Sequence, residues 1–111
     1  MGMVEKIMKR FDIWLIMKDL KNSRVVENLG LCVIISPDEL KDLPSYIVAP
    51  MTTQSEELNF RIKCKFDDTN GFIMVDQIRA IDKSYFIKKM GELETLEQVN
   101  LCNCLQEFYA F

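Results

Sequence analysis

The chain has 111 residues, of which 49% are apolar and 28% charged. This length fits one domain, residues 1–111, and the composition is too apolar for a disordered chain. Acidic residues outnumber basic ones by 17 to 14, for a net charge of −3, so a nucleic-acid site would have to be a local basic patch on an acidic body. The apolar runs are too short to cross a membrane and no signal peptide is evident, so we expect a cytoplasmic protein without a membrane partner.

The first half of the chain predicts three strands, at residues 11–17, 31–35 and 46–49. Between the first two lies a long polar connection whose only guanidinium is that of Arg24. Ser36 is expected to cap a short helix, with Pro37 at the favoured first position and Glu39 completing a capping box. Directly after the third strand come hydroxyl and amide side chains, which are either turn formers or binding groups: Thr52, Thr53, Gln54 and Ser55.

Residues 59–66 show the clearest alternation of apolar and basic side chains. Four apolar side chains are expected to point inward, and Arg61, Lys63 and Lys65 outward. Such a basic row could follow a phosphate backbone, but more often it is a solvated face that protects a sheet edge. Residues 67–71 are then expected to form a turn, in which Asn70-Gly71 is a strong hairpin signal into a strand at residues 72–75 that is buried on both faces.

A dense group of polar residues follows that buried strand: Asp76, Gln77, Arg79 and Asp82. Strand ends commonly carry binding and catalytic groups, although these residues would equally serve to satisfy backbone groups at a turn. A last strand is expected at residues 87–93. A capping box of Thr95 and Gln98 predicts a C-terminal helix. The fold class is therefore mainly β (α+β): a small barrel of about five to seven strands, with a short internal helix and a C-terminal helix.

The four cysteines are best explained as reduced core residues. Cys102 and Cys104 lie about 200° apart around a helix, so they do not pair locally. The sequence has no histidine and no Cys-x-x-Cys motif, so we expect neither a metal site nor a cofactor.

Four segments together resemble the MazF/PemK family of toxin ribonucleases, which shares its fold with the CcdB gyrase poisons. They are residues 11–15, 33–38 and 47–54, and the string Asp76-Gln77-Ile78-Arg79-Ala80-Ile81-Asp82-Lys83-Ser84. The resemblance implies an SH3-like barrel, a homodimer, and metal-independent cleavage of single-stranded mRNA that leaves a 2′,3′-cyclic phosphate. It also implies a cognate antitoxin that neutralises the toxin.

The resemblance assigns Thr52 and Asp76 to the catalytic site, and Thr53, Gln54, Gln77 and Arg79 to substrate binding. It departs from the family at Gly30-Leu31, where the family usually has Arg-Pro, whose arginine is its principal catalytic group. A guanidinium suits a phosphate because its planar fork matches the phosphate oxygens. Two arginines could take the place of the missing one, Arg24 in the polar connection or Arg79, and our hypothesis is that Arg24 is the catalytic phosphate clamp. Bases are expected to stack on aromatic residues such as Trp14 or Tyr85.

The departure at Gly30-Leu31 keeps a second function open. In that alternative the protein retains the fold but has impaired catalysis. It would then act as a MazF-like binding module or as a CcdB-like gyrase inhibitor.

Overall fold

The computed structural model describes residues 7–17, 29–53 and 60–110. The expectations for Arg24 and Gln54 fall outside these residues. The described elements are β1 (Asp12–Met17), β2 (Leu29–Ile34), η2 (Asp38–Leu40), β3 (Ser45–Thr52), β4 (Arg61–Phe66), β5 (Thr69–Met74), η3 (Val75–Gln77), β6 (Arg79–Asp82), η4 (Lys83–Tyr85), β7 (Phe86–Glu92) and α1 (Thr95–Phe108). Each η element is a single 3-10 turn.

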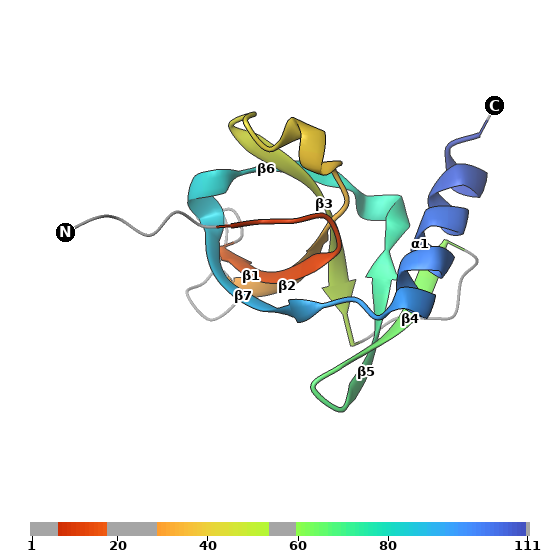
Figure 1. Ribbon diagram of the computed structural model, residues 1–111. Coiled ribbons are helices and arrows are strands. Elements are labelled where there is room, and N and C mark those ends of the chain that lie inside the picture. The colour runs from red at the N-terminus through yellow and green to blue at the C-terminus, as the bar shows by residue number, and fades with distance from the viewer. Residues whose placement is uncertain (1–6, 18–28, 54–59, 111) are drawn as a thin grey trace.

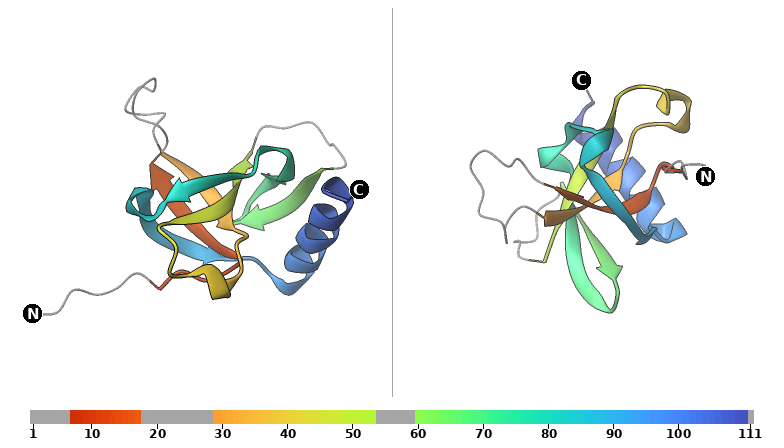
Figure 2. Two further views of the ribbon diagram at one scale, coloured as in Figure 1. Left: turned by 90° about the horizontal axis from the view of Figure 1, so that it is seen from above. Right: turned by 90° about the vertical axis from the view of Figure 1, so that its left-hand side faces the viewer.

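The strands form one curled antiparallel sheet in the order β4-β5-β3-β2-β1-β7, and β6 pairs with the first half of β3. Viewed as in Figure 1, strands β1, β2, β3, β6 and β7 curl into a ring, and β4, β5 and α1 lie to one side of it. The other views show the β4–β5 hairpin standing out from the ring, with α1 alongside (Figure 2). The predicted mainly β barrel with a C-terminal helix is confirmed.

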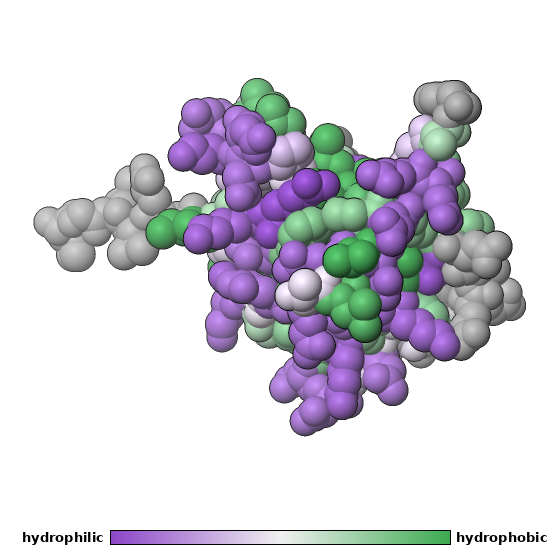
Figure 3. All heavy atoms as spheres, turned by 45° about the vertical axis from the view of Figure 1, so that its right-hand side comes forward, coloured by the Kyte–Doolittle hydropathy of each residue, from purple (hydrophilic) through white to green (hydrophobic). Residues whose placement is uncertain are grey.

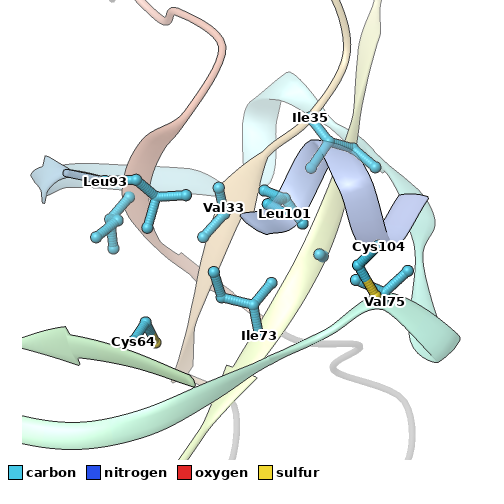
Figure 4. Close-up of a cluster of buried hydrophobic side chains, with 10 residues drawn as sticks. Val33, Ile35, Cys64, Ile73, Val75, Leu93, Leu101 and Cys104 are labelled. Atoms are coloured by element: carbon cyan, nitrogen blue, oxygen red, sulfur yellow. The ribbon is translucent and has the colours of Figure 1, made fainter. Parts of the chain in front are cut away.

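Each face of the sheet is covered by its own apolar cluster, because successive residues of a strand point to opposite sides. The first cluster fills the ring, where the Trp14 ring lies edge-on to Phe86 at 6.0 Å between centroids. The second lies between the opposite face of β1–β3, the β4–β5 hairpin and α1 (Figure 4). Leu101 and Cys104 are the buried residues of α1. No helix among the described residues is long and apolar enough to span a membrane.

Each predicted helix cap is wrong by one residue: η2 has its N-cap at Pro37 rather than Ser36, and α1 at Glu94 rather than Thr95. The Ser36 hydroxyl accepts a hydrogen bond from the Ile47 N–H at 3.3 Å, so it ties β3 to the preceding turn, and η2 begins only at Asp38. Helix α1 is capped by Glu94, whose carboxylate accepts from the helix backbone while Glu97 reaches back to the Glu94 N–H. Glutamate is a rare cap, so the pattern rules favoured Thr95 instead.

The turn predicted at residues 67–71 is confirmed, but it is shorter than expected and leaves Asn70-Gly71 out. The turn is Asp67-Asp68, where both residues have positive φ angles of 50° and 61°, as a two-residue type I′ hairpin requires. Asn70 and Gly71 lie within β5, opposite Lys65 and Cys64. Phe72 and Met74 are half-buried rather than buried, so only one face of β5 is fully covered.

Candidate functional site

A cavity of about 440 Å³ lies where β3 ends, and Thr52 and Thr53 both line it. Its remaining lining residues come from β2, from β3 and from the β4–β5 hairpin: Gly30, Leu31, Met51, Cys64, Phe66, Asp67, Thr69 and Gly71. Among these described residues the only charged side chain is that of Asp67. The described lining of the cavity therefore offers hydroxyl donors to a ligand but no cation.

The register of three strands fixes the position of Thr52. Thr52 lies opposite Phe72 on β5, and Phe72 lies opposite Lys63 on β4. Directly opposed residues share a sheet face, so Thr52, Phe72 and Lys63 form one row across the outward face. Gly71 allows this approach, because a Cβ at that position would lie 2.8 Å from the backbone oxygen of Thr52.

A second cavity of about 560 Å³ adjoins the first and shares Thr53, Cys64 and Gly71 with it. Lys63, Lys65, Asn70 and Phe72 line it from the hairpin, and Glu97 from α1. The two cavities thus flank the same part of the hairpin, and the second one brings two lysines close to the end of β3.

Asp76 lies in η3 and is held by Arg61 of β4. The Arg61 Nε donates to Oδ1 of Asp76 at 3.2 Å, and its Nη2 donates to Oδ2 at 3.0 Å. The hydrogen bonds from Arg61 are the main reason that the pKa of the Asp76 carboxyl lies below its ordinary value of 3.8. Sequence reasoning treated Arg61 as a solvated cation, but its side chain is only 16% exposed. The hairpin register would have revealed the pair, since Arg61 lies opposite Met74, two residues before Asp76.

Gln77 and Arg79 lie close to Asp76 in sequence and are both exposed. The Gln77 side chain hydrogen-bonds the Asp76 carboxylate, and Arg79 begins β6 opposite Val48 of β3. None of the three residues Asp76, Gln77 and Arg79 lines the cavity at Thr52. The described site residues therefore fall into two groups: Thr52 with Thr53 at the end of β3, and Asp76, Gln77 and Arg79 on η3 and β6.

Gly30 and Leu31, which stand where the family usually has Arg-Pro, line the Thr52 cavity directly. This departure from the family pattern thus lies beside Thr52. No group of three or more potential metal ligands occurs within residues 7–17, 29–53 and 60–110.

The structure corrects the expectation for Trp14. Its side chain is 4% exposed inside the ring, so it is not available to stack on a base. Tyr85, in η4, is well exposed. At the C-terminal end, the Tyr109 hydroxyl donates to the Val75 carbonyl at 3.1 Å, and Phe108 packs on Phe60, so these aromatic residues take part in packing.

The curled antiparallel sheet with its terminal helix defines a small β-barrel protein with a threonine-lined cavity at the end of β3. Residues 9–109 match the model of the PemK-like, MazF-like toxins of type II toxin-antitoxin systems, and the chain belongs to that family. No functionally curated protein matches its sequence.

Solved structures with the same fold have low sequence identity to this chain. A mycobacterial endoribonuclease in complex with its cognate antitoxin is 14% identical, with a TM-score of 0.76 over 91% of this chain and 93% of that one. MazF from Deinococcus radiodurans is 11% identical, with a TM-score of 0.76 over 96% and 100%. The MazE–MazF complex from the same organism gives 12% identity and a TM-score of 0.74 over 96% and 99%.

Proposed function

We propose that this toxin is a metal-independent endoribonuclease that cleaves single-stranded mRNA at the Thr52 cavity. The observation that carries the proposal is the pair of adjacent threonines in a cavity of about 440 Å³, in a chain of the PemK-like, MazF-like toxin family. Structural relatives described as endoribonucleases lend support to this activity.

The reaction uses a nucleophile within the RNA itself. The 2′-oxygen attacks the adjacent phosphorus, the bond from phosphorus to the 5′-oxygen breaks, and the products are a 2′,3′-cyclic phosphate and a 5′-hydroxyl. A base takes the proton of the 2′-hydroxyl, and an acid donates a proton to the departing 5′-oxygen. Donors and positive charge must stabilise the extra negative charge on the phosphorane oxygens.

The residues divide these tasks as follows. The Thr52 hydroxyl donates a hydrogen bond to a non-bridging phosphate oxygen, and Arg24 supplies the guanidinium that is absent from the described lining of the Thr52 cavity. Asp76 does not line the Thr52 cavity, and its role rests on the family resemblance alone: a carboxylate that orients the 2′-hydroxyl or accepts its proton. Its lowered pKa makes it a weak base, which favours the orienting role. Thr53, Gln54, Gln77 and Arg79 bind the flanking nucleotides.

The same relatives support a proposed protein partner. We propose a cognate antitoxin as the protein partner, since related structures contain a toxin with its antitoxin. We also propose a homodimer as the working form and the cytoplasm as the place of action, because mRNA is the substrate.

One observation favours the alternative function. None of the described residues lining the Thr52 cavity is cationic, and losing a single preorganised donor typically costs about 10²–10³ in rate. A protein without a replacement guanidinium would bind RNA or antitoxin without cutting, or would inhibit gyrase as CcdB proteins do.

Mapping of RNA ends distinguishes these functions. A long unstructured RNA is incubated with the protein in EDTA, the cut positions are mapped, and the new ends are tested for 2′,3′-cyclic phosphate. Arg24→Ala should abolish cleavage, and Arg24→Lys should restore little because a lysine lacks the planar fork.

Cuts at a defined sequence that persist in EDTA and disappear in Arg24→Ala would support the proposal. Cleavage that Arg24→Ala leaves unchanged would overturn the role of Arg24. A folded protein that makes no cuts would overturn the nuclease, and binding to antitoxin and gyrase would then be measured.

A further inference from the structure

We propose that the Thr52 cavity is also a nucleobase pocket, in which Asp67 selects guanine in the RNA strand that is cut. This inference deepens the proposed function and rests on it. It gives a role to Asp67, a residue that the resemblance to the toxin family leaves without one, and it names the base that the cavity accepts.

Asp67 lines the Thr52 cavity at some distance from Thr52 itself. It follows β4 directly and begins the turn of the β4–β5 hairpin, whose projecting end is covered by hydrophilic residues (Figure 3). Thr69, just after this turn, is three residues from Phe72, the strand partner of Thr52, which corresponds to about 10 Å along β5. Asp67 and Thr52 nevertheless line the same cavity. The cavity thus leaves room for a base near Asp67 while the phosphate lies at Thr52.

The size and the lining of the cavity suit a nucleobase. Its volume of about 440 Å³ lies within the usual range of small-molecule sites, about 300–1,000 Å³, which are mostly apolar with a few polar groups. Leu31, Met51 and Phe66 supply apolar surface, and Phe66 is half-buried. Single-stranded RNA is commonly bound with its bases stacked on aromatic side chains, while polar groups read the base edges.

The charge of Asp67 favours contact with a base rather than with a phosphate. Asp67 is the only charged side chain in the described lining of the cavity, and a carboxylate repels the negatively charged RNA backbone. Carboxylates bind bases by accepting hydrogen bonds from N–H groups on the base edge. The Asp67 side chain is exposed, and no ion pair or hydrogen bond engages it within the part of the chain that the structure describes. Its described neighbours thus leave both carboxylate oxygens to a ligand.

Guanine is the base that matches these groups. Its Watson–Crick edge carries two adjacent donors, N1–H and N2–H, which fit the two oxygens of a carboxylate, and the acceptor O6 lies beside them. Thr69 lies opposite Phe66, so it shares the hairpin face that lines the cavity, and its hydroxyl can donate to O6. Adenine, cytosine and uracil each present one donor on this edge, so they would lose one of the two bonds to Asp67.

The competing explanation is that Asp67 only shapes the turn. Asp67 and Asp68 have φ angles of 50° and 61°, and aspartate tolerates this left-handed region better than most residues. The two residues therefore share any role in the turn, but Asp68 lines neither the cavity of about 440 Å³ nor the one of about 560 Å³. Asp68→Asn is thus a matched control for Asp67→Asn, since asparagine suits both turn positions and removes the same charge.

The experiment compares guanine with hypoxanthine, which lacks only the 2-amino group. The cut sequence of the full-length wild type is first mapped in EDTA on a long unstructured RNA, and it should contain a guanine at one fixed position. That guanine is then replaced by hypoxanthine, as inosine, in a short RNA substrate. For the wild type, kcat/KM should fall about 10- to 100-fold, as expected for loss of one hydrogen bond to a charged group.

Asp67→Asn should remove this discrimination, because its amide nitrogen cannot accept the N2–H bond. Its kcat/KM should be the same for the two substrates, and other bases should appear at the fixed position among its mapped cuts. Asp68→Asn should keep both the wild-type sequence and the wild-type loss on hypoxanthine. If Asp67→Asn does not fold, Asp67→Gly, which also suits a positive φ, should show the same loss of discrimination.

A wild-type cut sequence without a fixed guanine would overturn the inference and leave the proposed function standing. A loss on hypoxanthine that Asp67→Asn retains would do the same. If the wild type binds RNA without cutting it, the nuclease is overturned, and affinities for an unstructured RNA and its inosine-for-guanosine counterpart are compared; equal affinities would then overturn the inference as well. A folded wild type that neither binds nor cuts RNA would overturn both.

Discussion

Arg61 and Asp76 form a two-point ion pair that joins β4 to the turn after β5, with N···O distances of 3.0 and 3.2 Å. Their side chains are 16% and 20% exposed, so water screens the pair only in part. The pair fixes Asp76 next to Gln77 and close to Arg79, and therefore sets the geometry of the second group of site residues.

Replacing Asp76 by Asn should destabilise the fold by about 1–3 kcal/mol, because a partly buried guanidinium loses a charged hydrogen-bond partner. The folded-state pKa of Asp76 lies below the ordinary 3.8. The stabilisation is therefore complete above the ordinary pKa and is lost as the pH falls through the folded-state pKa. Urea unfolding at neutral and acidic pH measures both effects.

Asp68→Asn serves as the control for this prediction, since Asp68 is almost fully exposed, and it should leave the unfolding midpoint unchanged. Equal midpoints for Asp76→Asn and the wild type at neutral pH would show that the ion pair does not stabilise the fold.

Gly71→Ala should damage both folding and function. The added Cβ would meet the Thr52 backbone oxygen at 2.8 Å, so β3 or β5 has to move, and overpacking of this kind costs about 1–3 kcal/mol. Gly91→Ala is the matched control, because its Cβ would meet the Phe66 side chain at 3.2 Å, and a side chain can shift. Thermal unfolding of the two variants should rank Gly71→Ala as the less stable, and the reverse order would contradict the close approach.

The four thiols should differ in reactivity in the folded protein. Burial raises the pKa of the Cys32 thiol to about 12 and that of the Cys64 thiol to about 11, and it also raises the pKa of Cys104. The thiolate is the reactive form, so an alkylating reagent at mildly alkaline pH should modify the half-exposed Cys102 first. Mass spectrometry of digests locates the label, with the urea-unfolded protein as the control. Rapid labelling of Cys32 in the folded state would contradict the buried position.

Glu94→Ala should destabilise α1 more than Thr95→Ala. Glu94 and Glu97 form the capping box of the helix, and loss of a cap costs about 0.5–2 kcal/mol, whereas Thr95 occupies the first helical position. Comparing the chemical unfolding of the two variants tests this assignment directly. A larger loss of stability for Thr95→Ala than for Glu94→Ala would show instead that Thr95 caps the helix, as the sequence pattern predicts.

Strand positions followed well from the sequence because alternation of apolar side chains reports which face of a sheet is buried. Cys64 belongs to the second core cluster, and Phe60, Ile62 and Phe66 pack against it. The polar strand β6 (Arg79–Asp82) shows no such alternation and was not predicted. The turn and the helix caps were predicted less accurately, because several neighbouring residues have side chains that suit a turn or a cap. Asn70-Gly71 is the preferred hairpin pair, but the register of β4 and β5 places the turn at Asp67-Asp68.

The site was harder to predict because it depends on contacts between distant residues. Nothing local distinguishes Arg61 from Lys63 and Lys65, although only Arg61 reaches Asp76, 15 residues away. Trp14 resembled a stacking residue, but β7 brings Phe86 against it inside the ring. Thr52 and Gly30-Leu31 were known as separate motifs, and only the fold places them around one cavity.

The cleavage rate of a Thr52→Val variant tests the central claim most directly. Valine keeps the volume and branching of threonine and removes only the hydroxyl. Thr95→Val, at an exposed helical position, is the control. In single-turnover assays with EDTA, Thr52→Val should cut RNA about 10²–10³ times more slowly than the wild type, as expected for loss of one preorganised donor, and Thr95→Val should cut at the wild-type rate. Equal rates for Thr52→Val and the wild type would show that the Thr52 cavity is not the catalytic site.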